Sequence, residues 1–184
     1  FMFGILVAIG ELPANATFGF LGMILGLGLV GVGLLSSMLH LGHPERAWRA
    51  FSQWKTSWLS REGVVSVISF APALGFFYLL VFEGVDHPQI GFLGWLTAIF
   101  SALTVYCTAM IYRSLLPIHQ WANGWTVPSY LTMGLAGGAV FIVLLYGVLK
   151  IPNSMSTYYA IGALGVAWAV KTRYWYFVDN SKSH

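Results

Sequence analysis

The chain has 184 residues, of which 58% are hydrophobic and 8% charged, and its mean hydropathy is +0.74. A soluble domain carries about 25% charged residues, so this composition excludes a water-soluble globule and indicates an integral membrane protein. The net charge is only +3 without a long basic run, which argues against nucleic-acid binding, and the single cysteine excludes an internal disulfide and a cysteine-ligated iron–sulfur cluster.

The apolar runs predict an all-α fold, a polytopic transmembrane helical bundle forming a single domain over 1–184. About 20 apolar residues cross the hydrocarbon core, so the short run at 1–10 is expected to be the end of a first helix, without a signal peptide. Gly22 and Gly26 have the Gly-x-x-x-Gly spacing of a close helix contact, a weak signal in a chain rich in glycine. Five runs are predicted to be full spans: 18–41, 62–82, 90–112, 125–149 and 158–175.

The polar connection at 43–61 carries aromatic residues at steps of three and four. Trp48, Phe51, Trp54 and Trp58 therefore predict one face of an amphipathic helix that lies in the membrane interface. This face either anchors the chain at the interface or walls a pocket for a ring-shaped ligand. The basic residues beside it are either solvated charges or partners for acids of another subunit.

Basic residues are concentrated on one side of the predicted bundle. Alternate connections carry seven of them, whereas the opposite connections carry one, Lys150, together with three acids. The positive-inside rule therefore predicts that the 43–61 connection faces the cytoplasm. The seven residues are Arg46, Arg49, Lys55, Arg61, Arg113, Lys171 and Arg173.

His40 and Glu62 flank this connection at the end of one span and the start of the next. An imidazole at membrane depth is costly unless it is used or paired, and it can hydrogen-bond a quinone carbonyl. Together with a carboxylate it would form a proton relay. The alternative is structural: His40 caps a helix end and Glu62 interacts favourably with a helix N-terminus.

Further candidates lie at the end of the 90–112 span. Tyr106 and Arg113 are two helical turns apart and share a face, and Tyr112 lies beside them, so they either contribute to a pocket or act as interfacial anchors. A haem needs two axial ligands, and only His40 lies within or at the edge of a span. The sequence therefore predicts no haem and no metal site.

Two segments carry a resemblance to a known family. Residues 37–50, SMLHLGHPERAWRA, followed by WLSRE at 58–62, resemble the signature of the dimethyl sulfoxide reductase anchor subunit family. Residues 104–112, TVYCTAMIY, and 171–175, KTRYW, resemble the branch found in cytoplasmic sulfite dehydrogenase complexes. The family normally has eight helices, so we expect the last two to be absent from this sequence.

The resemblance implies a membrane anchor in the bacterial inner membrane that holds a molybdopterin catalytic subunit and an iron–sulfur subunit. It also implies electron exchange with ubiquinone or menaquinone. The histidine of S-x-x-H-L-G carries over to His40 and the acid of L-S-x-E to Glu62. The remaining expected quinone contacts are Arg46, Trp54, Trp58, Tyr106, Tyr112 and Arg113. The expected docking residues for the partner subunits are His43, Glu45, Arg49, Lys55 and Arg61.

The direction of electron flow follows from the predicted orientation. Because the motif face is expected in the cytoplasm, we favour the sulfite-oxidising branch, in which the catalytic subunits stay in the cytoplasm. The alternatives are the anchor of a dimethyl sulfoxide-type reductase that oxidises menaquinol, and a purely structural anchor. A transporter would show Gly/Pro-broken helices and midplane charges, and Pro72 is the one candidate break.

Overall fold

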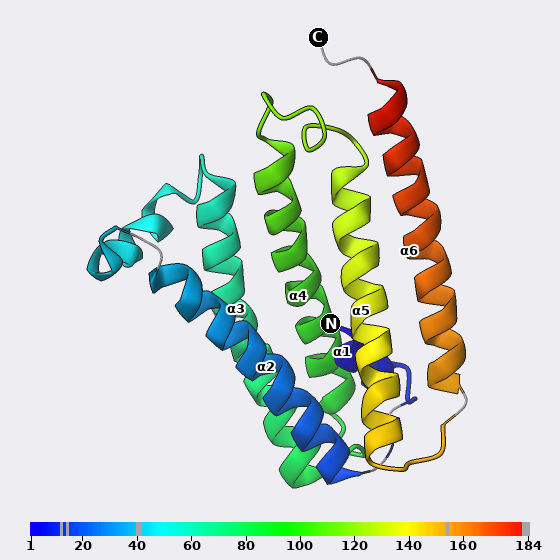
Figure 1. Ribbon diagram of the computed structural model, residues 1–184. Helices are drawn as coiled ribbons and strands as arrows, with labels where there is room; N and C mark the ends of the chain where they lie inside the picture. Colours follow the sequence, from blue (N-terminus) through cyan, green and yellow to red (C-terminus); the bar gives the residue numbers. More distant parts are fainter. Residues whose placement is uncertain (12, 14, 40–41, 154, 182–184) are drawn as a thin grey trace. The chain divides into compact units, whose positions relative to one another are not determined.

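The computed structural model describes residues 1–11, 13, 15–39, 42–153 and 155–181; most of these are helical, and none of them lies in a strand. The predicted fold class, an all-α polytopic helical bundle, is confirmed. The elements in Figure 1 are α1 (Met2–Ala8), α2 (Ala16–Leu39), η1 (Pro44–Gln53), α3 (Trp58–Tyr78), η2 (Leu79–Glu83), α4 (Ile90–Arg113), α5 (Thr126–Val148) and α6 (Met155–Asn180).

Four helical segments in the described part of the chain are long and apolar enough to cross a membrane. They are Ala16–Leu39, Trp58–Glu83, Ile90–Arg113 and Thr126–Val148, close to four of the predicted spans. α6 covers the fifth predicted span, 158–175, and has 26 residues, but it is not among these four segments because its second half is polar. A span at 158–175 therefore stays a prediction.

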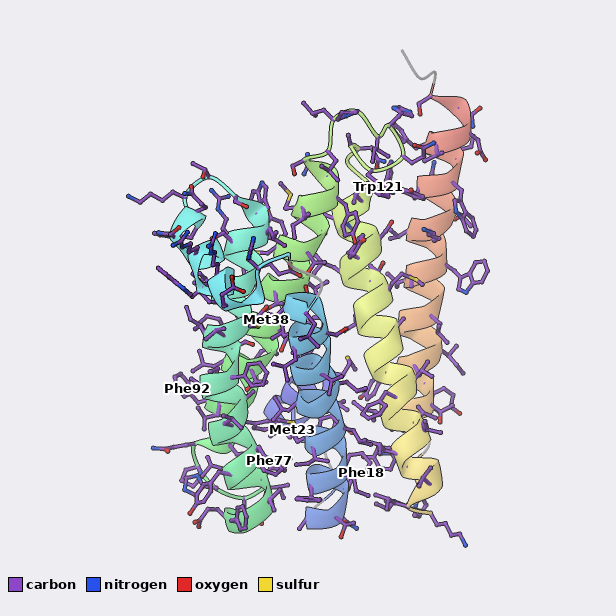
Figure 2. All side chains as sticks on the ribbon, turned by 60° about the vertical axis from the view of Figure 1, so that its left-hand side comes forward. Phe18, Met23, Met38, Phe77, Phe92 and Trp121 are labelled. Atoms are coloured by element: carbon purple, nitrogen blue, oxygen red, sulfur yellow. The ribbon has the colours of Figure 1, made fainter. Side chains whose placement is uncertain are left out.

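The chain divides into two compact units, Phe1–Ser101 and Ala102–His184, so α4 contributes to both. Aromatic residues form the core of the first unit. The ring of Phe3 in α1 lies 5.5 Å from that of Phe18 in α2, and Phe76 of α3 is fully buried. Figure 2 shows Phe18 and Phe77 at the same end of the α2–α3 pair. There the ring centre of Phe77 lies 5.9 Å from that of Phe20.

Glycines allow α1 to approach two other helices in this unit. A Cβ atom added to Gly94 of α4 would lie 2.9 Å from the carbonyl oxygen of Gly4, so the two backbones touch. A Cβ at Gly22 of α2 would collide with the ring of Phe3, whereas one at Gly26 would meet nothing within 4 Å. The predicted contact therefore exists at Gly22 only.

The second half of α2 has little packed against it in this unit. Its buried residues all lie between Phe18 and Met23, and beyond them large apolar side chains are exposed, up to 76% for Leu39. The exposed residues of this half include Leu29, Val30, Val32, Leu35 and Met38. The end of α2 that precedes the polar connection is thus an open apolar surface.

The second unit is organised by α5 and α6, which run side by side (Figure 1). Ala139 and Ile142 are buried on one face of α5, and Ala160 and Ala167 are buried on one face of α6. Small residues on facing helices let the backbones approach closely, which is the usual packing of helices in lipid.

Candidate functional site

The η1–α3 junction contains the centre of the sequence signature. Ser57 is the N-cap of α3, and its Oγ accepts a hydrogen bond from the Ser60 amide at 3.4 Å. A serine in this position satisfies one of the free amides of the first turn. The helix therefore begins at Trp58, earlier than the bound at 62 that we predicted from the apolar run, and it includes the whole WLSRE segment.

Arg61 joins α3 to the end of the polar connection. Its Nε donates to the carbonyl oxygen of Trp54 at 2.9 Å, and one terminal nitrogen donates to that of Lys55 at 2.6 Å. The guanidinium also lies over the ring of Trp58, 4.2 Å from its centre. These contacts fix the direction of the backbone between η1 and α3. Arg61 was predicted to dock a partner subunit; this stays a prediction, and its side chain bonds within the chain.

Trp48 and Phe51 lie on a 3₁₀ helix, within the connection over which an amphipathic helix was predicted. A 3₁₀ helix has three residues per turn, so Trp48 and Phe51 lie on the same side, and Trp54 follows as the C-cap. Phe51 contacts α3, where a Cβ on Gly63 would lie 3.0 Å from its ring. Trp54 is 55% exposed, and Trp58, the fourth predicted member of the face, belongs to α3.

Glu62 lies one turn inside α3 and is half-buried. Because the helix begins at Trp58, no acidic residue occupies its first turn. The favourable interaction of a carboxylate with a helix N-terminus falls off within that turn, so the structural alternative for Glu62 loses its main energetic reason. Its predicted partner His40 lies outside the described residues.

The charged residues of η1 are exposed and only loosely paired. His43 Nδ1 lies 3.0 Å from Glu45 Oε1, and Arg46 Nε lies 3.6 Å from the same oxygen. Arg49 lies over the ring of Trp48, 5.6 Å from its centre. Ion pairs this exposed contribute little to stability, which leaves these side chains available to a partner.

The other predicted site residues lie in the second unit, at the end of α4. Tyr106 is half-buried and Arg113 is exposed. The ring of Tyr112 stacks on that of Tyr130 of α5, with 5.4 Å between the ring centres, and meets the ring of Trp121, labelled in Figure 2, edge-on at 5.1 Å. The rings of this cluster pack against each other, so Tyr112 has a structural role whether or not it also contacts a ligand.

One polar group was missed by sequence reasoning. His119, in the loop before α5, bonds the hydroxyl of Ser181 and stacks on Phe177 at 5.7 Å, both at the end of α6. The partners are 62 and 58 positions away in the sequence, and no local spacing signals such a contact.

The side chains at the η1–α3 junction suit an aromatic headgroup with carbonyl oxygens. Trp54 and Trp58 offer ring surfaces, and Glu62 offers a half-buried carboxylate. Within the described residues, no group of three or more His, Cys, Asp or Glu is arranged to hold a metal ion. The absence of haem stays a prediction.

Comparison with known proteins agrees with the sequence signature. The model of the DMSO reductase anchor subunit (DmsC) family matches residues 1–171. The chain belongs to this family. As an anchor-subunit homologue with four helices suited to crossing a membrane, it is a multi-pass membrane protein.

Its curated relatives in the anchor family come from two kinds of complex. The C subunit of sulfite dehydrogenase from Allochromatium vinosum is 36% identical over 86% of this chain and 50% of its own length. The C subunit of anaerobic dimethyl sulfoxide reductase from Haemophilus influenzae is 33% identical over 74% of this chain and 47% of its own length. The Escherichia coli protein of the same description is 32% identical over 74% of this chain and 48% of its own length.

The chain spans about half the length of these curated anchor subunits. No solved structure matches it.

Proposed function

We propose that this chain anchors a molybdopterin catalytic subunit and an iron–sulfur subunit, and that it passes electrons from the iron–sulfur subunit to quinone during the oxidation of sulfite to sulfate. Membership of the anchor family supports the first part. Similarity to the C subunit of a sulfite dehydrogenase over 86% of the chain supports the choice of sulfite. The excess of basic residues in the 43–61 connection supports a docking face in the cytoplasm.

The observation that carries the quinone assignment is the position of Glu62. Glu62 is a half-buried carboxylate one turn inside a helix suited to crossing a membrane, and ionisable side chains in such a position usually serve a function. Arg61 links two tryptophans of the same junction, because it donates to the carbonyl oxygen of Trp54 and lies over the ring of Trp58. A ligand that exchanges protons and has a flat ring accounts for both features.

The chemistry assigned to this chain is proton delivery and orientation. In the catalytic subunit, sulfite and water give sulfate, two protons and two electrons. Bound quinone takes up two electrons and two protons. His40 and Glu62 hold the protons at the membrane face, and the tryptophan rings exclude water and orient the headgroup. Arg46 remains a proposed contact of this ligand, and Tyr106, Tyr112 and Arg113 remain proposed quinone contacts of the second unit.

Docking is assigned to the exposed charges of η1 and the turn after it. His43, Glu45, Arg49 and Lys55 are the proposed contacts with the iron–sulfur subunit. For Arg61 we propose positioning instead of docking, because its guanidinium holds the carbonyl oxygens of Trp54 and Lys55. It would act on the quinone site by fixing the spacing of the two tryptophans.

The test separates quinone reduction from sulfite oxidation in the assembled complex. His40→Ala and Glu62→Gln should lower the rate with quinone at least about a hundredfold, the usual size of an acid–base contribution. The rate of sulfite oxidation with a soluble artificial acceptor should stay unchanged. His87→Ala and Glu83→Gln are matched controls, since both residues lie at the other end of the α3–α4 pair. Full quinone reduction by His40→Ala would rule out the assignment.

A second candidate is the anchor of a dimethyl sulfoxide-type reductase, which the 33% and 32% identities to the C subunits of two such reductases support. Electrons would then flow from menaquinol to the catalytic subunit. The purified complex should reduce dimethyl sulfoxide with a menaquinol analogue and should not oxidise sulfite. Mass analysis of the extracted lipid distinguishes both candidates from a purely structural anchor, which would retain no quinone.

A further inference from the structure

The second unit contains a cleft that the proposed quinone site does not use. It has a volume of about 310 Å³ and lies between the start of α5 and the end of α6. Three aromatic rings form most of its walls, and one cation is present. Its lining residues are Trp125, Arg173, Tyr176, Phe177, Asn180 and Ser181.

The cleft is held by contacts between the loop before α5 and the end of α6. His119 bonds the Ser181 hydroxyl and stacks on Phe177, and the Tyr174 hydroxyl donates to the carbonyl oxygen of Gln120 at 3.0 Å. These contacts join segments more than fifty residues apart. The walls are therefore set by tertiary contacts and do not depend on a ligand to form.

Among the polar side chains that line the cleft, Arg173 is the one whose donors are left for a ligand. The Asn180 amide already donates to the carbonyl oxygen of Tyr176 at 2.8 Å, and the Ser181 hydroxyl donates to that of Phe177 at 2.6 Å. Arg173 has no hydrogen bond or ion pair with any other described residue. A guanidinium presents five donors in a planar fork that suits phosphate oxygens.

We propose that this cleft binds the headgroup of an anionic phospholipid, with its phosphate on Arg173 and its glycerol and upper acyl carbons along the rings of Trp125, Tyr176 and Phe177. The cleft lies at the start of α5, a helix suited to crossing a membrane, where a lipid headgroup would be close by. Basic pockets between helices on the cytoplasmic side commonly bind such headgroups, and aromatic residues favour the same depth. A neutral quinone would leave the charge of Arg173 unmatched.

The experiment measures lipid binding to the full chain in neutral detergent by native mass spectrometry. Phosphatidylglycerol is compared with phosphatidylcholine of the same acyl chains. The wild type should bind phosphatidylglycerol about fivefold more tightly, the effect of one basic residue near an anionic lipid. Arg173→Gln should abolish this preference, and Arg173→Lys should retain most of it, because the charge stays.

Lys150→Gln is the matched control, since it removes one charge at the opposite end of α5. It should leave the preference unchanged. Equal affinity for the two lipids, or a preference that persists in Arg173→Gln, would overturn the proposal. Displacement of phosphatidylglycerol by inorganic phosphate or by a short-chain quinone would also overturn it, because the cleft would then serve a different ligand. The proposal does not rest on the quinone assignment.

Discussion

Replacing Arg61 by alanine should loosen the polar connection from α3. The change removes the hydrogen bonds to Trp54 and Lys55 at 2.9 and 2.6 Å and the ring contact with Trp58 at 4.2 Å. Bonds from a charged donor are worth about 1.5–3 kcal/mol each when shielded, and about 1 kcal/mol is reasonable for a half-exposed side chain. The loss of these bonds, together with that of the ring contact, makes local opening about 2 kcal/mol cheaper in the variant. The open state should then be populated about thirtyfold more, and the amides of the junction should exchange about thirtyfold faster.

Hydrogen exchange of the junction measures this opening directly. The amides of Thr56 and Ser57 bond the carbonyl oxygen of Gln53 at 3.0 and 2.9 Å, so their exchange reports whether the turn is closed. Arg49→Ala is the control, because the Arg49 side chain has no hydrogen bond or ion pair with another described residue. Arg61→Lys should give an intermediate rate, since it can keep one bond. If Arg61→Ala exchanged no faster than Arg49→Ala, the clamp would not exist in solution.

Two further predictions concern the second unit and are checked by thermal unfolding in detergent. Ser129 has a buried hydroxyl without a partner among the described residues, so Ser129→Ala should be neutral or stabilise the protein by about 1 kcal/mol. Thr132→Val removes a 2.8 Å hydrogen bond to the carbonyl oxygen of Pro128 and should destabilise the protein by about 1 kcal/mol. The reverse order would contradict this reasoning. Tyr112→Ala should lower the free energy of unfolding by about 2 kcal/mol, because it removes two ring contacts, whereas Tyr112→Phe should be nearly as stable as the wild type. An equal loss of stability in both variants would mean that the hydroxyl matters more than the rings.

The helices could be predicted closely because apolar length decides them. The run at 90–112 became Ile90–Arg113, and the run at 125–149 became Thr126–Val148. The start of α3 was misplaced because the apolar run begins after Glu62, while the helix begins at its serine cap. Ser57 is a good N-cap residue, and giving it more weight would have corrected the bound.

The internal geometry of the candidate site could not be predicted from the sequence, because it depends on the folded backbone. Steps of three and four residues fit both a 3₁₀ and an α-helix over so few turns, so the alignment of Trp48 and Phe51 needed the backbone. The bonds of Arg61 depend on how a long side chain is oriented against carbonyl oxygens after the turn has formed. The contact of His119 with Ser181 depends on the packing of α5 on α6.

The open apolar surface on the second half of α2 has a thermodynamic consequence. Several of its glycines, including Gly28, Gly31 and Gly33, would meet nothing within 4 Å if they carried a Cβ atom. Small residues let a neighbouring helix approach the backbone closely, so this surface could accept one. If covering this surface changes the affinity of the protein for a ligand, the ligand must change the affinity for the covering element by the same factor.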